Sequence, residues 1–253
     1  DKSNIMNKII VVSNHAKDVF EKTSYKLVND KTKEEFPFVM TAPVDVVNYP
    51  VKEYDELPEL ELDLPTKFNF LCISQMGPRK NLPNLIKWFL EEFENDDVGL
   101  VLKTNFAKNS LIDKTTCERH LKTLVKQFSK DRKCKLYLLH GDMTDEEIHS
   151  LYINEKLNAF VSLPHGEGFG LPIFEAAYSG MPVVTVGWSG QCDYLYDSDG
   201  KEKFYNVSFD INHIQKDAVW DGVLQKDSMW AFPRENSAKE QMRKCYEDVL
   251  NKT

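Results

Sequence analysis

Short apolar runs alternate with helical patterns along most of this sequence, and this alternation restricts the possible fold more than any other feature. Five runs have the length and composition of buried strands: 68–73, 98–102, 136–139, 159–163 and 183–186. The segments between them carry apolar residues at the spacing of amphipathic helices, over 82–93, 116–128, 144–152 and 172–179. This alternation predicts an α/β fold with a parallel, doubly wound, Rossmann-like sheet. Ligands of such sheets bind at the carboxyl ends of the strands.

The two ends of the chain add further elements. The run 9–12 predicts a strand, Ser13 predicts the start of a helix over 14–22, and a polar turn over 29–35 leads to a strand at 38–41. Ser237 and Glu240 have the spacing of a capping box and predict the start of the last helix, as Thr144 and Glu147 do for the helix over 144–152.

A polar stretch divides the chain. Residues 49–66 hold three prolines and six carboxylates without any periodicity, which is typical of a linker. We therefore expect a small N-terminal unit over 1–48, a linker over 49–66 and a ligand-binding domain over 67–253.

Charge and cysteine content exclude several classes of protein. With 40 acidic and 32 basic residues the net charge is −8, which argues against a nucleic-acid partner. Five cysteines without a CxxC pair predict neither a disulfide framework nor a zinc site, and we expect that the histidines and cysteines do not cluster. We therefore expect no metal, and a reducing, cytoplasmic location. No apolar run reaches the ~20 residues of a membrane helix, and at most peripheral membrane contact is expected. Because the chain begins with Asp1, we expect a fragment or a processed product.

The stretch His165-Gly-Glu-Gly-Phe-Gly-Leu-Pro-Ile-Phe-Glu175 follows a strand and opens a helix. With Pro172 at the first helical position, Leu171 would be the cap residue, and its side chain cannot accept a hydrogen bond. The first helical N–H groups are then free for a ligand anion. A carboxylate such as Glu175 can accept hydrogen bonds from a sugar diol. The alternative is a simple glycine turn with acidic residues near a helix N-terminus.

Two glutamates eight residues apart around Gly-Phe-Gly-Leu-Pro resemble the E-x7-E motif of the retaining glycosyltransferases of family 4, the group 1 glycosyltransferases, which have the GT-B fold. The resemblance implies that Glu167 faces the donor sugar as the catalytic residue and that Glu175 binds the ribose. It places the rest of the motif at the donor as well: Gly168, Phe169, Gly170 and Leu171.

Three further segments resemble the same family. Pro78-Arg79-Lys80-Asn81 is similar to its donor-phosphate loop, which implies that Arg79 and Lys80 bind the diphosphate, although Gln75 stands where many members have Arg. Gly141 and Met143, in His140-Gly-Asp-Met143, match a loop that contacts the nucleotide base; an ordinary strand-to-helix turn is the alternative. The loop 187–193 resembles one near the donor sugar, where Trp188 fits a core position equally well.

The resemblance implies the C-terminal, donor-binding half of a glycosyltransferase that transfers a sugar from a nucleoside diphosphate to a hydroxyl with retention. It implies no cofactor, GDP-mannose in preference to a UDP-sugar as donor, and a glycan or lipid-linked acceptor. Residues 1–48 would be a remnant of the N-terminal acceptor domain, and without the rest of that domain the chain would be inactive or weakly hydrolytic. A non-catalytic nucleotide-sugar-binding module and a nucleotide-sugar isomerase are the alternatives.

Overall fold

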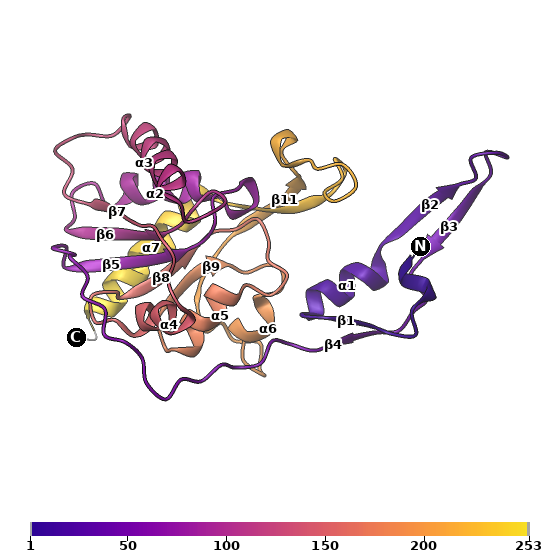
Figure 1. Cartoon of the computed structure of the whole chain (residues 1–253), viewed down its shortest axis with the longest axis horizontal. Helices are drawn as coiled ribbons and strands as arrows, with labels where there is room; N and C mark the ends of the chain where they lie inside the picture. Colours follow the sequence, from indigo (N-terminus) through magenta and orange to yellow (C-terminus); the bar gives the residue numbers. More distant parts are fainter. Residues whose placement is uncertain (1, 252–253) are drawn as a thin grey trace.

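The computed structural model describes residues 2–251 and has a six-stranded, wholly parallel sheet at its centre (Figure 1). The strands are β5 (Phe68–Ile73), β6 (Val98–Lys103), β7 (Lys135–Leu139), β8 (Ala159–Ser162), β9 (Val183–Val186) and β10 (Tyr205–Val207). Their order is β10-β9-β8-β5-β6-β7. The chain therefore reverses its direction across the sheet between β5 and β8. A crevice at the carboxyl ends of these two strands is the usual ligand site of an open α/β sheet.

Helices cover both faces of the sheet, which confirms the predicted α/β, doubly wound fold. One face packs against α2 (Leu82–Glu92), α3 (Leu111–Val125) and α7 (Glu235–Leu250), and the other against α4 (Asp145–Ile153) and α5 (Leu171–Tyr178). Alternation along β5 divides the core: Phe68 and Phe70 point to the first face and Leu71 to the second. The short α6 (Cys192–Leu195) follows β9.

One predicted helix start is confirmed and two differ from the structure. The capping box of Thr144 and Glu147 is confirmed at α4. The capping box predicted from Ser237 and Glu240 is wrong, because α7 begins earlier, at Glu235. The Ser237 hydroxyl accepts a hydrogen bond from the Ser208 N–H instead. Helix α3 begins five residues earlier than predicted, where Ser110 caps it.

An antiparallel hairpin that the sequence did not predict projects from the domain. It consists of β11 (Phe209–His213) and β12 (Met229–Pro233), and a 3₁₀ turn over Lys216–Ala218 lies in its loop. Buried His165 holds this hairpin against the sheet, since its ring stacks on Trp230 and bonds to the Ala231 carbonyl.

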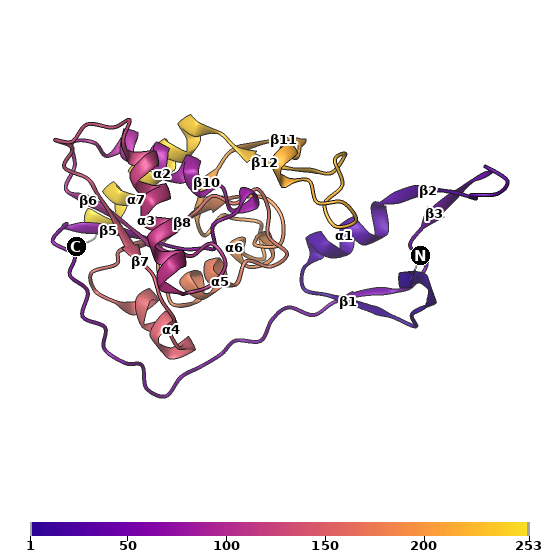
Figure 2. The same cartoon turned by 45° about the horizontal axis from the view of Figure 1, so that its top comes forward.

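The N-terminal unit stands away from the six-stranded domain (Figures 1 and 2). It contains a 3₁₀ turn (Lys2–Ile5), β1 (Ile9–Val11), α1 (Asn14–Lys22), β2 (Ser24–Val28), β3 (Glu35–Val39) and β4 (Val44–Val46). Strands β1 and β4 pair in parallel, and β2 and β3 form a hairpin around the predicted polar turn. The strand expected at 38–41 is wrong in position, because β3 ends at Val39, and β2 was not predicted.

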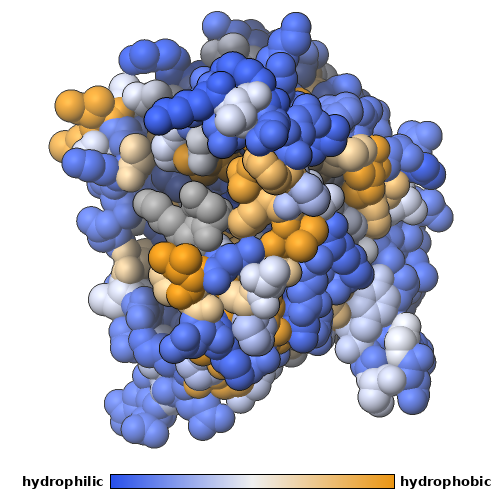
Figure 3. Space-filling model, turned by 90° about the vertical axis from the view of Figure 1, so that its right-hand side faces the viewer, coloured by the Kyte–Doolittle hydropathy of each residue, from blue (hydrophilic) through white to orange (hydrophobic). Residues whose placement is uncertain are grey.

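Few contacts join the N-terminal unit to the rest of the chain. The Asn14 N–H and the Asn48 side chain donate to Asp193, and His15 lies 4.8 Å from the Trp188 ring. Residues 47–67 contain no helix or strand. Figure 3 views the molecule from this end, and apolar side chains are visible on its surface; exposed ones in the unit include Ile5, Ile10, Tyr25, Val28 and Phe36. The predicted domain boundaries, after residues 48 and 66, stay a prediction.

Within residues 2–251, no helix is both long and apolar enough to cross a membrane.

Candidate functional site

Two loops that are about 85 residues apart in the chain lie side by side at the switch point of the sheet. The loop after β5 holds Arg79 and Lys80, and the loop after β8 holds Glu167. Backbone contacts join them: the His165 N–H donates to the Arg79 carbonyl (2.8 Å), and the Asn81 side chain donates to the Leu163 carbonyl (3.1 Å). The parallel pairing of β5 with β8 makes this meeting possible.

The carboxylate of Glu167 forms ion pairs with both predicted phosphate-binding cations. Arg79 Nη1 lies 2.9 Å from one oxygen and Lys80 Nζ lies 2.5 Å from the other. Arg79 also donates to the Gly166 carbonyl. Glu167 is almost buried, whereas Arg79 is 42% exposed. The structure therefore gathers three of the predicted site residues into one cluster in which the cations share a single carboxylate.

A cavity of about 590 Å³ opens beside this cluster, at the carboxyl ends of β5, β6 and β7. Arg79, Lys80 and Met143 line it, as do Gln75 and Pro172. The Gln75 side chain donates to the Phe106 carbonyl and so faces the β6 side of the cavity. These loops converge because the strands that precede them are neighbours in the sheet.

The wall of the cavity that follows β6 holds Lys103, Thr104, Asn105 and Asn109. From the sequence, Lys103 at the end of this strand is either a phosphate contact or a solvated lysine, and no motif identifies the other three. Burial lowers the pKa of Lys103, whose ammonium donates to the Gly141 carbonyl. The Thr104 hydroxyl is buried and has no hydrogen-bond partner among the residues that the structure describes. The end of the apolar run at Leu102 is the signal that could have identified this wall.

The start of α5 differs by one residue from its prediction. The N-cap is Gly170 rather than Leu171, and Pro172 is the second helical residue. Gly170 adopts a φ of 87°, which glycine adopts without strain. Neither residue caps the helix with a side chain, so the expected consequence holds: the first N–H groups have no side-chain acceptor.

Glu175 lies one turn into α5, where Tyr152 donates a hydrogen bond of 2.9 Å to its carboxylate. Burial raises the pKa of Glu175 above its usual value, and the hydrogen bond from Tyr152 offsets only part of this effect. Tyr152 thereby fixes one oxygen of Glu175.

Phe169 is a packing residue in this structure. Its ring is buried against Tyr49, Phe174 and Tyr194. The Tyr194 hydroxyl donates to the carbonyls of Phe169 and Gly170, which fixes the turn before α5.

The loop after β9 packs against the loop that holds Glu167 and is joined to it by hydrogen bonds. The Glu167 N–H donates to the Ser189 hydroxyl, and the Gly190 N–H donates to the Glu167 carbonyl. The backbones approach so closely that a Cβ on Gly190 would lie 2.0 Å from the Gly168 carbonyl oxygen. Trp188 is half-buried against the hydrophobic core, and its ring would lie 2.7 Å from a Cβ on Gly166.

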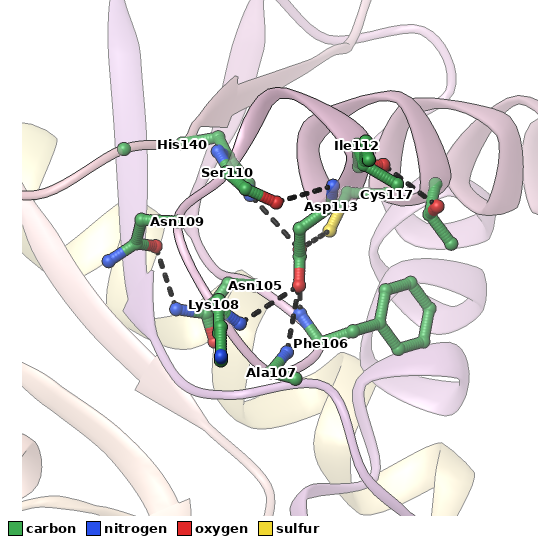
Figure 4. Close-up of polar contacts among 12 residues, drawn as sticks. Asn105, Phe106, Ala107, Lys108, Asn109, Ser110, Ile112, Asp113, Cys117 and His140 are labelled. Carbon is green, nitrogen blue, oxygen red and sulfur yellow. Dashed lines mark hydrogen bonds and ion pairs between the residues drawn. The ribbon is translucent and has the colours of Figure 1, made fainter.

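Asp113, Cys117 and His140 form a polar cluster behind the β6 wall (Figure 4). Asp113 accepts hydrogen bonds from the backbone N–H groups of Phe106, Ala107 and Lys108, and its carboxylate lies 3.0 Å from His140 Nε2. The expectation that the histidines and cysteines do not cluster is therefore wrong here, because β6 and β7 bring 113 and 140 together.

The contacts of this cluster stabilise the loop over 106–108 against α3 and His140. Backbone donors hold the pKa of Asp113 well below its usual range. Burial raises the pKa of the Cys117 thiol to about 11, which favours the protonated thiol at neutral pH.

One spacing in the sequence runs against the prediction that no metal binds, because Asp197 and Asp199 form an Asp-x-Asp triplet, which is found in cation sites. Asp197 accepts the N–H groups of Asp199 and Lys201 and pairs with Lys203, as the first residue of a turn.

Comparisons with known proteins agree with this geometry. The family model "Glycosyl transferases group 1" matches residues 59–205, more than half of the chain. A serotype-specific mannosyltransferase of Escherichia coli, WbdA, is 33% identical over 119 residues, which cover 46% of this chain and 13% of the relative.

Two solved structures share the fold at low identity. The trehalose-6-phosphate synthase OtsA has a TM-score of 0.53 at 10% identity, and the match covers 75% of this chain and 47% of that one. The α,α-trehalose-phosphate synthase of Burkholderia xenovorans gives 0.51 at 12% identity, covering 75% and 48%. The match thus spans less than half of each of these three relatives. It belongs to the group 1 glycosyltransferases, and its six-stranded domain is the C-terminal, Rossmann-like half of their GT-B fold.

Proposed function

We propose that this chain is the donor-binding half of a retaining glycosyltransferase that takes its sugar from a nucleoside diphosphate. The observation that carries the proposal is the cluster of Arg79, Lys80 and Glu167, in which the two cations also line the cavity. Two cations beside an uncapped helix suit a diphosphate. Glu175 lies one turn along that helix, where its free lone pairs can accept a ribose hydroxyl.

In the proposed mechanism, catalysis is mainly positioning and electrostatics. Arg79, Lys80 and the first N–H groups of α5 stabilise the departing diphosphate, and Glu167 orients the donor sugar rather than attacking it. The reaction needs no cofactor. GDP-mannose is the proposed donor, because WbdA is a mannosyltransferase. The proposed acceptor is a glycan or a lipid-linked hydroxyl.

The proposed setting is the cytoplasm. All five cysteines are free and four of them are buried, as in proteins of reducing compartments.

Calorimetric titration with GDP, UDP and ADP tests donor binding. We expect GDP to bind most tightly. Arg79→Ala and Glu175→Ala should each weaken binding at least several-fold, because a charge-assisted hydrogen bond contributes about 1.5–3 kcal/mol. Arg119→Ala and Glu240→Ala, exposed residues away from the cavity, are the matched controls. If both site variants bind GDP as well as the wild type does, the site is misplaced.

Activity is tested on the chain and on its full-length gene product side by side. We propose that the chain alone binds donor but transfers at most slowly, because donor and acceptor meet between two domains whose closure excludes water. Robust acceptor-dependent transfer by the chain would contradict this domain assignment. Donor binding without transfer in either protein would favour the non-catalytic module, and conversion of the nucleotide sugar without an acceptor would favour the isomerase.

A further inference from the structure

The solvent-facing side of α3 carries no fully exposed carboxylate, although the chain has 40 acidic residues. We call this surface the α3 face; Figure 2 brings α3 toward the viewer. It presents two aliphatic side chains, three threonines and four cations: Leu111, Ile112, Thr115, Thr116, Thr123, Lys114, Arg119, Lys122 and Lys126. The acidic residues of the helix lie elsewhere, since Asp113 is bound to the 106–108 backbone and Glu118 is half-buried.

The cations of the α3 face are uncompensated. None of the four forms an ion pair with any residue between 2 and 251, whereas Lys87 and Lys239 on the neighbouring helices α2 and α7 do. Residues 114–135 contain eight basic and two acidic residues in a chain whose net charge is −8. A local positive field of this kind attracts an anionic partner.

The same face is apolar at its amino end. Leu111 is 82% exposed and Ile112 is 81% exposed, the two highest values among the large hydrophobic residues of the structure. The threonines add methyl groups, because their hydroxyls donate to helix carbonyls four residues earlier: Thr115 to Leu111 at 3.0 Å, Thr116 to Ile112 at 2.9 Å and Thr123 to Arg119 at 3.0 Å. Figure 4 shows Ile112 at this end of the helix.

We propose that the α3 face docks on an anionic lipid surface. Its cations would lie against the phosphate headgroups, with Leu111 and Ile112 inserted at the boundary of the acyl chains. Two aliphatic side chains that project into solvent beside unpaired cations on long stems match the two layers of an anionic membrane interface, the acyl boundary and the headgroups. The 105–109 wall of the cavity leads directly into α3, so docking would hold the donor site close to the membrane.

Cosedimentation of the 253-residue chain with vesicles tests the proposal. Vesicles of phosphatidylcholine with about 30 mol% phosphatidylglycerol are compared with phosphatidylcholine alone, at low salt and at about 0.5 M NaCl. The variants are K122E/K126E and L111S/I112S. K201E/K226E changes the net charge equally at exposed lysines that form no ion pair in the described part of the chain, and is the matched control. Thermal melting confirms that each variant is folded.

We expect the wild type to bind the anionic vesicles at least tenfold more tightly than the neutral ones, and to lose this preference at high salt. K122E/K126E should lose at least tenfold in affinity, L111S/I112S at least threefold, and K201E/K226E less than twofold. Absence of wild-type binding to the anionic vesicles would overturn the proposal. So would an equal loss in K201E/K226E, or full binding by L111S/I112S. Binding to poly-glutamate without binding to vesicles would identify the face as a site for acidic protein instead.

Discussion

Glu167→Gln separates the role of the Glu167 carboxylate from that of the cations beside it. This carboxylate forms ion pairs with both Arg79 and Lys80, at 2.9 Å and 2.5 Å. A diphosphate that binds these cations has to compete with the carboxylate for them. We therefore expect Glu167→Gln to tighten the binding of GDP, even though it removes the proposed catalytic residue.

The size of the effect follows from the exposure of the two pairs. Glu167 is 10% exposed and Lys80 20%, so their pair is largely shielded, while Arg79 at 42% is partly screened by solvent. Exposed pairs contribute about 0.2–1 kcal/mol, and breaking fully buried pairs costs about 3–5 kcal/mol. An intermediate value of about 1–2 kcal/mol corresponds to a gain in GDP affinity of about 5–30-fold.

Titration calorimetry with GDP on the wild type and Glu167→Gln measures this gain. Glu175→Gln is the matched control. It replaces one carboxylate oxygen by an NH2 group at a residue that does not pair with the cations, and it should weaken binding. Thermal melting confirms that both variants are folded. Unchanged or weaker GDP binding by folded Glu167→Gln would refute the competition and would mean that the carboxylate orients the cations for phosphate.

Three further outcomes are expected. The lowered pKa of Asp113 means that its stabilising contribution is present above the usual aspartate range and is lost as pH falls from about 4 toward the folded-state pKa. Asp113→Asn should therefore flatten the loss of melting temperature between about pH 5 and 2, and a slope equal to that of the wild type would contradict this account. Gly190→Ala should lower the free energy of unfolding in urea by about 2–3 kcal/mol, because the new Cβ meets the Gly168 carbonyl, while Gly77→Ala, which meets nothing within 4 Å, should change it little. EDTA should leave GDP affinity nearly unchanged, and a tenfold loss that manganese restores would show that a metal takes part.

Much of the core domain could be predicted from the sequence, because its local patterns and its tertiary structure agree. The five predicted strands of the sheet are mostly apolar runs, and α2 has a single apolar stripe, with Leu85, Ile86 and Phe89 fully buried. The sixth strand, β10 (Tyr205–Val207), is short and less apolar and was not predicted. The failures are local patterns that tertiary contacts overrode. Ser237 has capping-box spacing but bonds to Ser208, a residue that only the fold brings near. The β11–β12 hairpin has no strong periodicity, and its place depends on buried His165.

The candidate site was also predictable only in part from the sequence. The residue types of the site were evident from the chain alone: two cations before one helix, and two carboxylates eight residues apart around the start of another. The contacts of these residues depend on strand order instead. They are the pairing of Glu167 with both cations, the burial of Lys103 at the cavity wall and the hydrogen bond from Tyr152 to Glu175. Sequence determines which elements form, since helix and strand periods are local. Only the tertiary structure decides which loops meet, because the placement of β8 beside β5 is set by packing between residues about 90 positions apart.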